Sequence, residues 1–438
     1  MSATTVAAAP RRTRVPGVVL LLAAVTFCLG TSEFMIAGLL EPMAADLDVS
    51  IPQAGLLITA FAVGMVVGAP AMAVLTLRLP TRSTLVLMTL VFAAAHVLGA
   101  LAPGYGLLLV SRVVAAVACG GFWALAAVHA HRASPPEAVG RSLAALVGGL
   151  TIANLVGVPG GAWLGERYGW RAAFWVIAVV TTLAAVLVAV TVRDPRPAAG
   201  APGASPARTR DLLARELGVF RTGRIWLALA TTAFFQASVF AAFSYFSPLL
   251  TKVAGLDPDA VPLALVGFGV GAFVGVTVGG RIADRNLFAN LLGSLAATAL
   301  SLLLLAAVAS VTWAAVGAVL LVGMSGFSIA GALNARVFQI ADGAPTLAAS
   351  MNTAAFNVGN AVGPALGGAV IALGLGYRAP VLVGVVLVLG AVATTRVAMR
   401  RDGIRVRRSA PVHPEVPVAS PAPDGDDPAA VLPSCCVG

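Results

Sequence analysis

Charged residues are scarce in this 438-residue sequence: only 11% of the chain is Asp, Glu, Lys or Arg, whereas 59% is hydrophobic and the mean hydropathy is +0.95. So little polar surface cannot cover a soluble globule of this length. The sequence also has no Walker-type phosphate loop, no nucleophile elbow and no metal-binding motif. These absences exclude a soluble protein and leave an enzyme, ATPases included, as the least expected function.

The chain has only four cysteines, and none of them has the spacing of a metal site or an evident disulfide role. Cys28 and Cys119 lie in apolar stretches, and Cys435 and Cys436 lie in the polar tail. The last four residues imitate a prenylation motif, but Gly438 is an unusual final residue for one. Lysine is rarer still, with one Lys against 27 Arg, which favours a high-GC bacterial genome. We expect no metal, no cofactor and no lipid anchor.

In place of charge the sequence has apolar runs of about 18 to 25 residues, each long enough for a helix to cross a hydrocarbon core of about 30 Å. We predict an all-α integral membrane protein with twelve transmembrane helices. The first run is a poor signal peptide, because it continues past an acidic residue and shows no small-residue cleavage site. The predicted spans are 17–39, 53–76, 83–102, 106–130, 140–164, 171–192, 224–248, 260–280, 288–310, 312–337, 347–374 and 379–399.

The few basic residues are distributed unevenly between the loops. With the N-terminus in the cytoplasm, 23 of the 28 basic residues lie on the cytoplasmic side, four lie outside, and Arg112 lies within a span. This positive-inside bias predicts that both termini are cytoplasmic. It also explains the net charge of +10 by topology, so we expect no nucleic-acid partner.

Landmark residues recur at a spacing of 206 or 207 residues, which indicates an internal duplication. Because each half has six predicted spans, an even number, both halves enter the membrane from the same side, and we predict that they are parallel repeats related by an axis along the membrane normal. The matched landmarks are Phe61, Gly64, Gly68 and Arg78 with Phe268, Gly271, Gly275 and Arg285; Asn154, Gly157 and Gly161 with Asn360, Gly363 and Gly367; and Gly169-Trp170-Arg171 with Gly376-Tyr377-Arg378.

The duplication divides the chain into five segments. Residues 1–16 are a cytoplasmic N-terminal segment, 17–192 the first six-helix half, and 224–400 the second half. Residues 193–223 are rich in Pro, Ala and Arg and are interpreted as a cytoplasmic linker. Residues 401–438 have no amphipathic period, so we expect a disordered cytoplasmic tail whose role the sequence leaves open.

Two charged side chains lie well inside predicted spans, away from their ends, where each costs roughly 2.5 to 3.5 kcal/mol on the insertion scale. Glu33 in the first span and Arg112 in the fourth reach the outer half of the membrane at similar depth, and we expect them to meet. Such a carboxylate can couple proton binding to a change of partner. The alternative is a static buried ion pair. His96 in the third span is expected to have a structural role.

The loop between spans 8 and 9 reads Gly280-Arg281-Ile282-Ala283-Asp284-Arg285, which resembles the G-x-x-x-D-R core of the major facilitator superfamily. The resemblance implies a charged latch, formed by Asp284 and Arg285, that closes the cytoplasmic side. The matching loop between spans 2 and 3 keeps Arg78 and Arg82 but has lost the acid and the glycines. Whether these two arginines form a latch or only set the topology stays open.

Spans 5 and 11 each carry a run rich in glycine and proline. Small residues let helices approach closely in lipid, and proline introduces bends, so we predict helix interfaces. The span 5 version resembles the motif of drug/proton antiporters, although Val158 separates its glycine from its proline. The residues concerned are Gly157, Pro159 and Gly161 in span 5 and Gly363, Pro364, Gly367 and Gly368 in span 11.

Inward spans of both halves supply candidates for a substrate pocket. Any single aromatic residue among them is as well explained by packing or by contact with lipid, whereas a buried amide needs a polar partner. The candidates are Phe34, Met35, Phe61, Trp123, Phe235, Gln236, Tyr245, Asn334, Phe356 and Asn357.

From Gly30-Thr31-Ser32-Glu33-Phe34-Met35 to Gly64-Met65-Val66-Val67-Gly68-Ala69-Pro70, the sequence resembles the arabinose-efflux-like, twelve-span branch of drug/proton antiporters, and most closely the bacterial chloramphenicol exporters. The resemblance extends to about residue 400. It implies the major facilitator fold, a monomer in the bacterial cytoplasmic membrane, and efflux of a small drug by alternating access, with the proton as coupling ion at Glu33 and Arg112. The alternatives are an exporter of sugars, nucleosides or another small metabolite, and a membrane sensor that does not transport.

Overall fold

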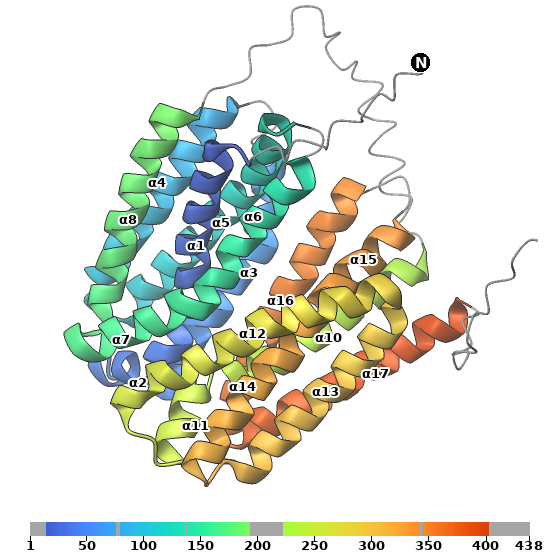
Figure 1. Cartoon of the computed structure of the whole chain (residues 1–438). Helices are drawn as coiled ribbons and strands as arrows, with labels where there is room; N and C mark the ends of the chain where they lie inside the picture. The colour runs from blue at the N-terminus through green and yellow to red at the C-terminus, as the bar shows by residue number, and fades with distance from the viewer. Residues whose placement is uncertain (1–14, 76–78, 136–137, 193–221, 342–344, 403–438) are drawn as a thin grey trace, which may run out of the picture.

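The computed structural model describes residues 15–75, 79–135, 138–192, 222–341 and 345–402. Within these ranges it has twelve helical spans long and apolar enough to cross a bilayer (Figure 1). The first half comprises α1 (Gly17–Phe34), α2 (Ile36–Asp46), α3 (Ile51–Leu75), α4 (Thr81–Ala100), α5 (Tyr105–Ala133), α6 (Val139–Ile152), the π-helical turn η3 (Ala153–Gly157), α7 (Val158–Tyr168) and α8 (Trp170–Thr191).

The second half repeats this layout with different interruptions. It comprises α10 (Gly223–Phe243), α11 (Phe246–Lys252), the 3₁₀ turn η5 (Pro258–Ala260), α12 (Val261–Arg285), α13 (Leu287–Val308), α14 (Thr312–Ser328), α15 (Ala330–Ile340), α16 (Pro345–Ala372) and α17 (Ala379–Arg401). The predicted linker, the tail and Arg78 lie wholly or almost wholly outside the described residues.

Each predicted span coincides with one observed span, although the ends differ by a few residues. The largest difference is in the first span, which was expected to end near residue 39 but continues through α2 to Asp46. The apolar run ends earlier than the helix because a helix needs only its backbone hydrogen bonds to continue, and the last turns of α2 carry polar residues toward the membrane surface.

Spans 1 and 7 are both interrupted near their middles. The first is broken at Met35, between α1 and α2, and the seventh at Ser244 and Tyr245, between α10 and α11. Pro42 lies inside α2 and Pro248 inside α11. Interrupted helices at corresponding positions of two repeats are typical of the substrate and ion sites of secondary transporters. The residues around Met35 and Tyr245 are therefore candidates for a substrate or ion site.

The helix pairs within the two halves correspond one to one. Contacts of α3 with α5, α4 with α8, and α1 with α6 in the first half are repeated as α12 with α14, α13 with α17, and α10 with α16 in the second. Equivalent spans therefore have equivalent neighbours. This is the arrangement expected of parallel repeats, and it confirms the duplication inferred from the recurring landmarks.

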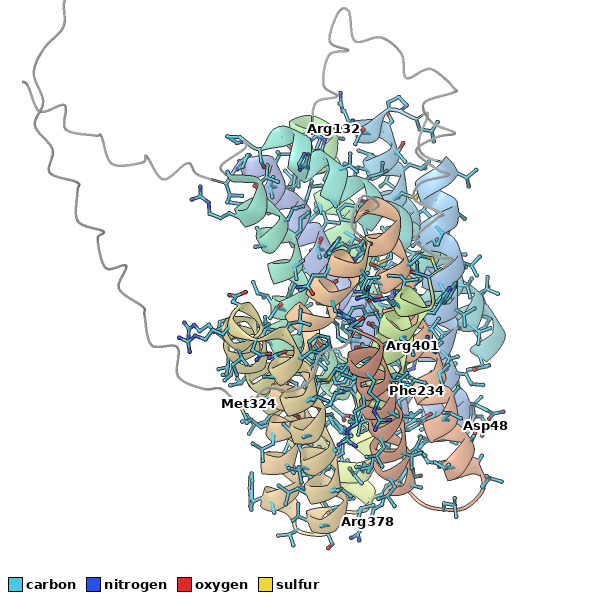
Figure 2. All side chains as sticks on the ribbon, turned by 90° about the vertical axis from the view of Figure 1, so that its right-hand side faces the viewer. Asp48, Arg132, Phe234, Met324, Arg378 and Arg401 are labelled. Atoms are coloured by element: carbon cyan, nitrogen blue, oxygen red, sulfur yellow. The ribbon has the colours of Figure 1, made fainter. Side chains whose placement is uncertain are left out.

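We name the two ends of the bundle by the first span: the near face is where α1 begins at Gly17, and the far face is where α2 ends at Asp46. Figure 2 shows Arg132 at the near-face end and Arg378 at the opposite end. The halves meet through α3 with α16, through α12 with η3 and α7, and through α2 with α11. In Figure 1, α2, α7, α11 and the first turns of α12 gather at the far face, and the two halves diverge toward the near face.

Candidate functional site

Glu33 lies in the last turn of α1, directly before the break at Met35, and is partly exposed. Its Oε1 accepts a hydrogen bond of 3.2 Å from Nδ2 of Asn360 on α16, in the other half. The Oδ1 of Asn360 in turn accepts one of 2.7 Å from Nε2 of Gln236 on α10. The acid of the first half is thus connected directly to an amide pair, Asn360 and Gln236, of the second half.

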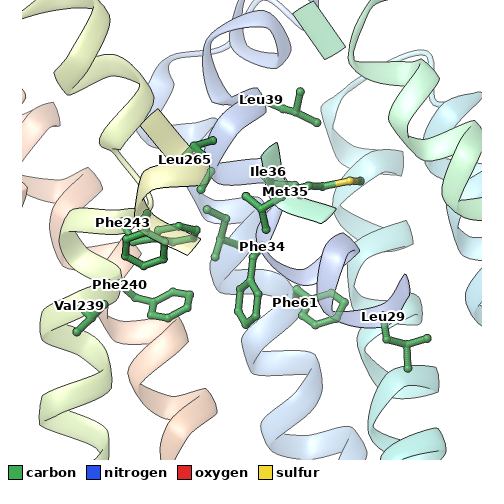
Figure 3. Close-up of a cluster of buried hydrophobic side chains, with 14 of the residues drawn as sticks. Leu29, Phe34, Met35, Ile36, Leu39, Phe61, Val239, Phe240, Phe243 and Leu265 are labelled. Atoms are coloured by element: carbon green, nitrogen blue, oxygen red, sulfur yellow. The ribbon is translucent and has the colours of Figure 1, made fainter. Parts of the chain in front are cut away.

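A narrow pocket, packed too tightly to hold a water molecule in this conformation, surrounds this connection. Phe34 and Phe61 of the first half and Phe240 of the second supply its aromatic walls, and Glu33 and Asn360 supply its polar side. The Phe34 ring lies 5.4 Å from the Phe240 ring between centroids. Figure 3 shows Phe34 between Phe61 and Phe240, with Phe243 beside Phe240. The pocket is therefore built by both halves, next to the breaks in spans 1 and 7.

Arg112 approaches Glu33 but does not pair with it, which corrects the expectation that the two side chains meet. None of the ion pairs within 4.0 Å in the described ranges joins them. The buried guanidinium of Arg112 instead donates to Ser32 Oγ (2.9 Å) and to the Ser32 carbonyl oxygen (3.0 Å). It also lies 4.5 Å over the Phe61 ring, a cation–π arrangement. The arginine thus contacts the neighbour of the acid, where neutral oxygens accept from two of its nitrogens.

Three of the other pocket candidates are buried in packing contacts. Met35 faces the Gly161 backbone of α7, and Phe235 lies in the apolar core. The Tyr245 hydroxyl donates to the Pro364 carbonyl oxygen at 2.8 Å. All three are at most 2% exposed, so in this conformation they support the breaks in spans 1 and 7 without lining the pocket.

The remaining candidates lie on α5, α15 and α16. Asn334 is exposed and accepts a hydrogen bond of 2.9 Å from Asn352 Nδ2. The amide nitrogen of Asn357 donates within its own helix, to the Thr353 carbonyl oxygen. Trp123 and Phe356 are half-buried. These four residues do not line the pocket at Glu33, and a role in substrate binding stays a prediction for them.

The two glycine-proline runs pack onto the broken spans of their own halves. A Cβ at Gly157 would overlap the Thr31 side chain on α1, and one at Gly363 would lie 2.5 Å from the Ala237 carbonyl oxygen on α10. Gly161 and Gly367 make similar approaches to Met35 and Tyr245. Pro159 is buried beside them, and a Cβ at Gly368 would meet both Tyr245 and Pro52 of α3. Both runs therefore brace the segments that carry the pocket.

The expected latch is not formed within the described residues. Asp284 and Arg285 end α12 as exposed side chains, and no ion pair there includes Asp284. Arg82 lies in the first turn of α4 at the near face, and Arg78, the other arginine of that loop, is among the residues not described. A latch role for these residues stays a prediction, because closing the near face would require the two halves to move.

A different near-face ionic network lies within the second half. Asp402, whose side chain is only 3% exposed, pairs with Arg336 of α15 and, at 2.6 Å, with Arg224 of α10. Arg336 also lies 4.9 Å over the Phe288 ring. The network joins the ends of three spans. It was not predicted, because Asp402 falls in a segment interpreted as part of the tail.

At the far face, the two halves are joined by a clasp of Glu41, Thr251 and Lys252. The Thr251 hydroxyl on α11 donates to Glu41 Oε1 of α2 at 2.5 Å, and Lys252 Nζ lies 3.7 Å from Glu41 Oε2. Thr59 adds a hydrogen bond to the Ala361 carbonyl oxygen nearer the middle of the bundle. The clasp holds the far sides of α2 and α11 together.

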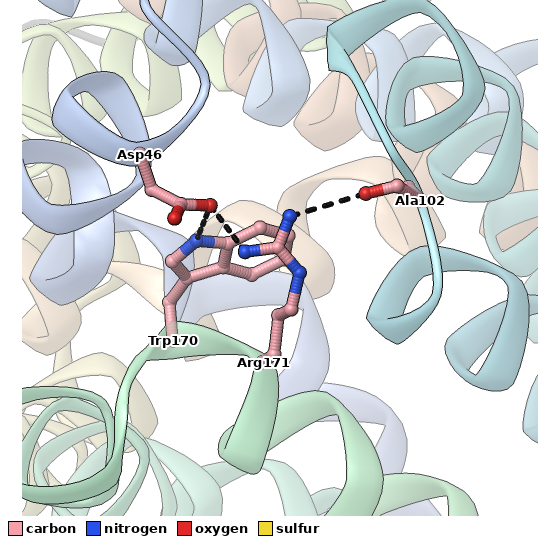
Figure 4. Close-up of polar contacts among 4 residues, drawn as sticks. All are labelled: Asp46, Ala102, Trp170 and Arg171. Atoms are coloured by element: carbon pink, nitrogen blue, oxygen red, sulfur yellow. Dashed lines mark hydrogen bonds and ion pairs between the residues drawn. The ribbon is translucent and has the colours of Figure 1, made fainter.

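Within the first half, Asp46 forms a far-face staple with Trp170 and Arg171 of α8 (Figure 4). Its Oδ2 accepts from Trp170 Nε1 at 3.0 Å and from Arg171, which also donates to the Ala102 carbonyl oxygen at 3.1 Å. The Arg171 guanidinium, with help from the Trp170 N–H, lowers the pKa of the Asp46 carboxyl below its usual value. The staple therefore stays ionised at neutral pH.

Sequence reasoning missed the residues that connect the titratable groups. Asn360 was noted only as a repeat landmark, and Ser32 and Asn352 were not singled out. A signal existed for Asn360, because a polar amide inside a glycine-rich transmembrane segment needs a partner. No signal in the sequence shows that Ser32 bonds Arg112. Within the described ranges, no group of three or more His, Cys, Asp or Glu residues could hold a metal ion.

Comparison with known proteins identifies the family of this chain. A family model described as Major Facilitator Superfamily matches residues 22–353. The chain is 43% identical over 349 residues to a chloramphenicol resistance protein of Streptomyces lividans, covering 78% of this chain and 86% of the relative. It is 36% identical over 368 residues to the inner membrane transport protein YdhP of Escherichia coli strain K12, covering 84% of this chain and 92% of the relative.

Solved structures share the fold at low identity. A bacterial homolog of the human lysosomal transporter Spinster superposes with a TM-score of 0.72 at 19% identity and covers 88% of this chain and 96% of its own. The D-xylose-proton symporter superposes with a TM-score of 0.69 at 16% identity. The match covers 86% of this chain and 96% of the symporter. These likenesses confirm the predicted fold of twelve spans in two parallel-related halves. The relatives confirm the resemblance drawn from the sequence. The chain is a multi-pass membrane protein and belongs to the Major Facilitator Superfamily of transporters.

Proposed function

We propose that this protein exports a small uncharged drug in exchange for protons, and that chloramphenicol is a substrate. The observation that carries the proposal is Glu33: an acid at the break of the first span, inside a pocket built by both halves, bonded to Asn360 across the interface. An acid held there at a cost of roughly 2.5 to 3.5 kcal/mol needs a function. Proton binding is the function that its chemistry supports.

The proposed orientation follows from charge. With the near face in the cytoplasm, 23 of the 28 basic residues lie on that side. Both termini are then cytoplasmic, and the membrane is the bacterial cytoplasmic membrane. Because the pocket is formed within one chain, the monomer is the transport unit that we expect. The far-face clasp, Glu41 with Thr251 and Lys252, would close the external side in this conformation.

Coupling would follow from the charge dependence of a hydrogen bond. An ionised Glu33 accepts a charge-assisted bond from Asn360, which is about twice as strong as a neutral one. Protonation weakens this bond between the halves and changes the balance between conformations. The carboxylate would lose its proton to the cytoplasm before drug binds, and would take up a new one from outside after the drug has left.

The substrate class follows from the lining of the pocket. Phe34, Phe61 and Phe240 offer apolar contact surfaces, and Asn360 offers hydrogen-bonding groups beside a single acid. An uncharged molecule with polar substituents suits these walls better than an ion does, because the site contains one acid and no free cation within the described residues. The name of the Streptomyces lividans relative points to chloramphenicol as the first molecule to test.

The test is accumulation of labelled chloramphenicol in cells that express the protein, with and without a protonophore. We expect low accumulation that rises to the level of empty cells when the proton gradient collapses. Glu33→Gln, which keeps the size of the side chain, is expected to insert normally and to lose at least about tenfold of the gradient-driven export. Glu166→Gln is the matched control, because this acid lies in α7 outside the pocket.

Two results would contradict the proposal. If the wild-type protein left drug accumulation unchanged, sugars, nucleosides and other small metabolites would be tested next in the same assay. If export survived in Glu33→Gln, drug transport would stand, but Glu33 would not be the proton site.

A further inference from the structure

His96 is buried on α4 and hydrogen-bonded at both ring nitrogens. Its Nδ1 lies 2.7 Å from the Phe92 carbonyl oxygen, one turn earlier, and its Nε2 lies 2.6 Å from Ser32 Oγ on α1. The ring lies between Phe92, at 4.3 Å, and Phe174, at 5.6 Å between centroids, and is tilted against both. The proposed export cycle does not use this histidine, yet it contacts the same serine that binds Arg112.

The direction of each hydrogen bond in this group can be assigned. A carbonyl oxygen only accepts, so His96 Nδ1 carries the hydrogen in the bond to Phe92. In the neutral ring Nε2 is then an acceptor, and the Ser32 hydroxyl donates to it. The same hydroxyl oxygen accepts from Arg112 Nη1. A charged imidazole would place two cations on one buried hydroxyl, so the arrangement requires a neutral ring.

Arg112 is thereby held by neutral acceptors. Ser32 binds it through both Oγ and the carbonyl oxygen, and Phe61 covers one face of the guanidinium. Its Nε has no hydrogen-bond partner within the described residues, so one buried donor of the side chain is unsatisfied. A stronger acceptor, the Glu33 carboxylate, belongs to the residue next to Ser32. The present hold is therefore one of two arrangements open to the arginine.

We propose that Ser32 and His96 are positioning residues that hold Arg112 away from Glu33, and so leave the Glu33 carboxylate to bind Asn360 in the other half. The proposal rests on the proposed function, because it assigns Arg112 its place in the proton cycle. His96 fixes the Ser32 hydroxyl with its oxygen toward Arg112. Without that anchor the hydroxyl rotates, the hold weakens, and Arg112 turns to the carboxylate.

The consequence is a change in proton coupling that a purely structural role would not produce. When Arg112 pairs with Glu33, a proton must displace a cation, so more acid is needed to protonate the carboxylate. Two other ionisable groups lie nearby: Cys119, two turns after Arg112 on α5, interacts electrostatically with Glu33, and His96 on α4 interacts with Arg112. Neighbouring α3, η3 and α16 contain no ionisable residue. Arg112 is the charged neighbour of Glu33 on these elements, and its rearrangement is expected to produce the change.

The first test is the pH profile of chloramphenicol/proton exchange in proteoliposomes. In His96→Phe, which keeps a ring but loses both nitrogens, we expect the half-maximal pH to fall by about half a unit or more, with a slower maximal rate. His96→Gln keeps an acceptor toward Ser32, and we expect it to restore the wild-type profile. Retained drug binding by both purified variants shows that they are folded. A wild-type profile in His96→Phe would overturn the proposal.

The second test does not depend on transport. Histidine ¹⁵N resonances of the full-length protein, assigned to His96 by their loss in His96→Gln, report the tautomer and the hydrogen bonding at each nitrogen. We expect a neutral ring with hydrogen on Nδ1 from pH 5 to 8, and an Nε2 resonance that moves in Ser32→Ala. A cationic ring, or hydrogen on Nε2, would overturn the proposal. Absence of export by the wild-type protein would instead refute the proposed function, and this measurement would still decide the arrangement.

Discussion

The two halves of the molecule share one scaffold but carry different chemistry. Both have a first span broken near its middle, equivalent helix pairs, and a glycine-proline run that braces the break. The first half places Glu33, Arg112 and His96 inside the membrane. The second half supplies Gln236, Asn360 and aromatic rings to the same region. Duplication has thus preserved the packing, while the ionisable and the neutral parts of the site have separated.

The separation has a physical reason. Each charge inside the bilayer costs free energy, and two carboxylates that share a site cannot both ionise easily. One acid is sufficient to bind one proton. An amide in the other half can form a hydrogen bond whose strength depends on the charge of that acid, and the amide adds no second charge.

The largest effect is expected where both halves depend on a close approach. Gly157→Ala puts a methyl group into the Thr31 side chain, and Gly363→Ala puts one against the Ala237 carbonyl oxygen. Each should destabilise the protein by about 1 to 3 kcal/mol. Thermal unfolding of the purified protein measures the loss as a lower Tm. Gly160→Ala is the control, because nothing lies within 4 Å of its added methyl group and alanine favours a helix. Equal losses at Gly157 and Gly160 would refute the assigned packing.

The second-largest effect is expected at the hydrogen bond between Glu33 and Asn360, which joins the ionisable and the neutral parts of the site. Asn360→Leu removes the partner of Glu33 in the other half, so protonation no longer changes a contact between the halves. Gradient-driven drug uptake into inverted proteoliposomes should fall roughly tenfold or more, as expected for a lost hydrogen bond to a charged group. Thr59→Val removes a neutral bond in the same interface, to Ala361, and should cost about threefold or less. A reversed order would show that the charge of Glu33 is not what joins the halves.

The smallest effect is expected at the far-face staple. Arg171→Ala breaks the pair with Asp46, an exposed contact worth about 0 to 1 kcal/mol. Its counterpart Arg378 is exposed and has no ion pair within the described residues, so Arg378→Ala should leave the Tm unchanged. We expect Arg171→Ala to lower the Tm by no more than about 2 °C at pH 7. An equal loss at Arg378 would contradict this difference between the halves.

The pH dependence of the staple has a definite sign. Because the folded-state pKa of Asp46 is below its usual value of about 3.9, the contact stabilises the protein at pH values above that value. The stability is lost as the pH falls through the folded-state pKa. The Tm difference between the wild-type protein and Arg171→Ala should therefore be constant from pH 8 to pH 5 and vanish only in stronger acid. A difference that disappears already near pH 6 would indicate another group.

Sequence reasoning went further with the fold than with the site. The twelve spans, the duplication and the positions of the two glycine-proline runs were all predicted, because each follows from a local pattern of apolar and small residues. Arg112 lies at the level of Glu33 along the helices, as predicted, but it bonds Ser32 and not Glu33. Depth follows from the residue number along a helix, whereas the partner depends on rotation about the helix axis and on competing acceptors such as Ser32.

The predicted pocket shows the same limit. Phe34 and Phe61 line it, whereas Tyr245 and Met35 are packed into the supports of the broken spans. These residues share a similar depth and a similar apolar character, so the sequence has no signal that separates them. The direction of each side chain depends on where the helix breaks, and the breaks at Met35 and Tyr245 were not predicted.

By itself, the sequence determined that this protein lies in a membrane, that it has twelve spans in two related halves, and that an acid and an arginine lie within the bilayer. These properties follow from composition, run length and repetition, which are properties of a chain before it packs. The tertiary structure decided that Glu33 binds Asn360, that Ser32 and His96 hold Arg112, and that Glu41 clasps Thr251 and Lys252. Such choices depend on which acceptors are brought within about 3 Å of a donor, and only packing of distant segments brings them there.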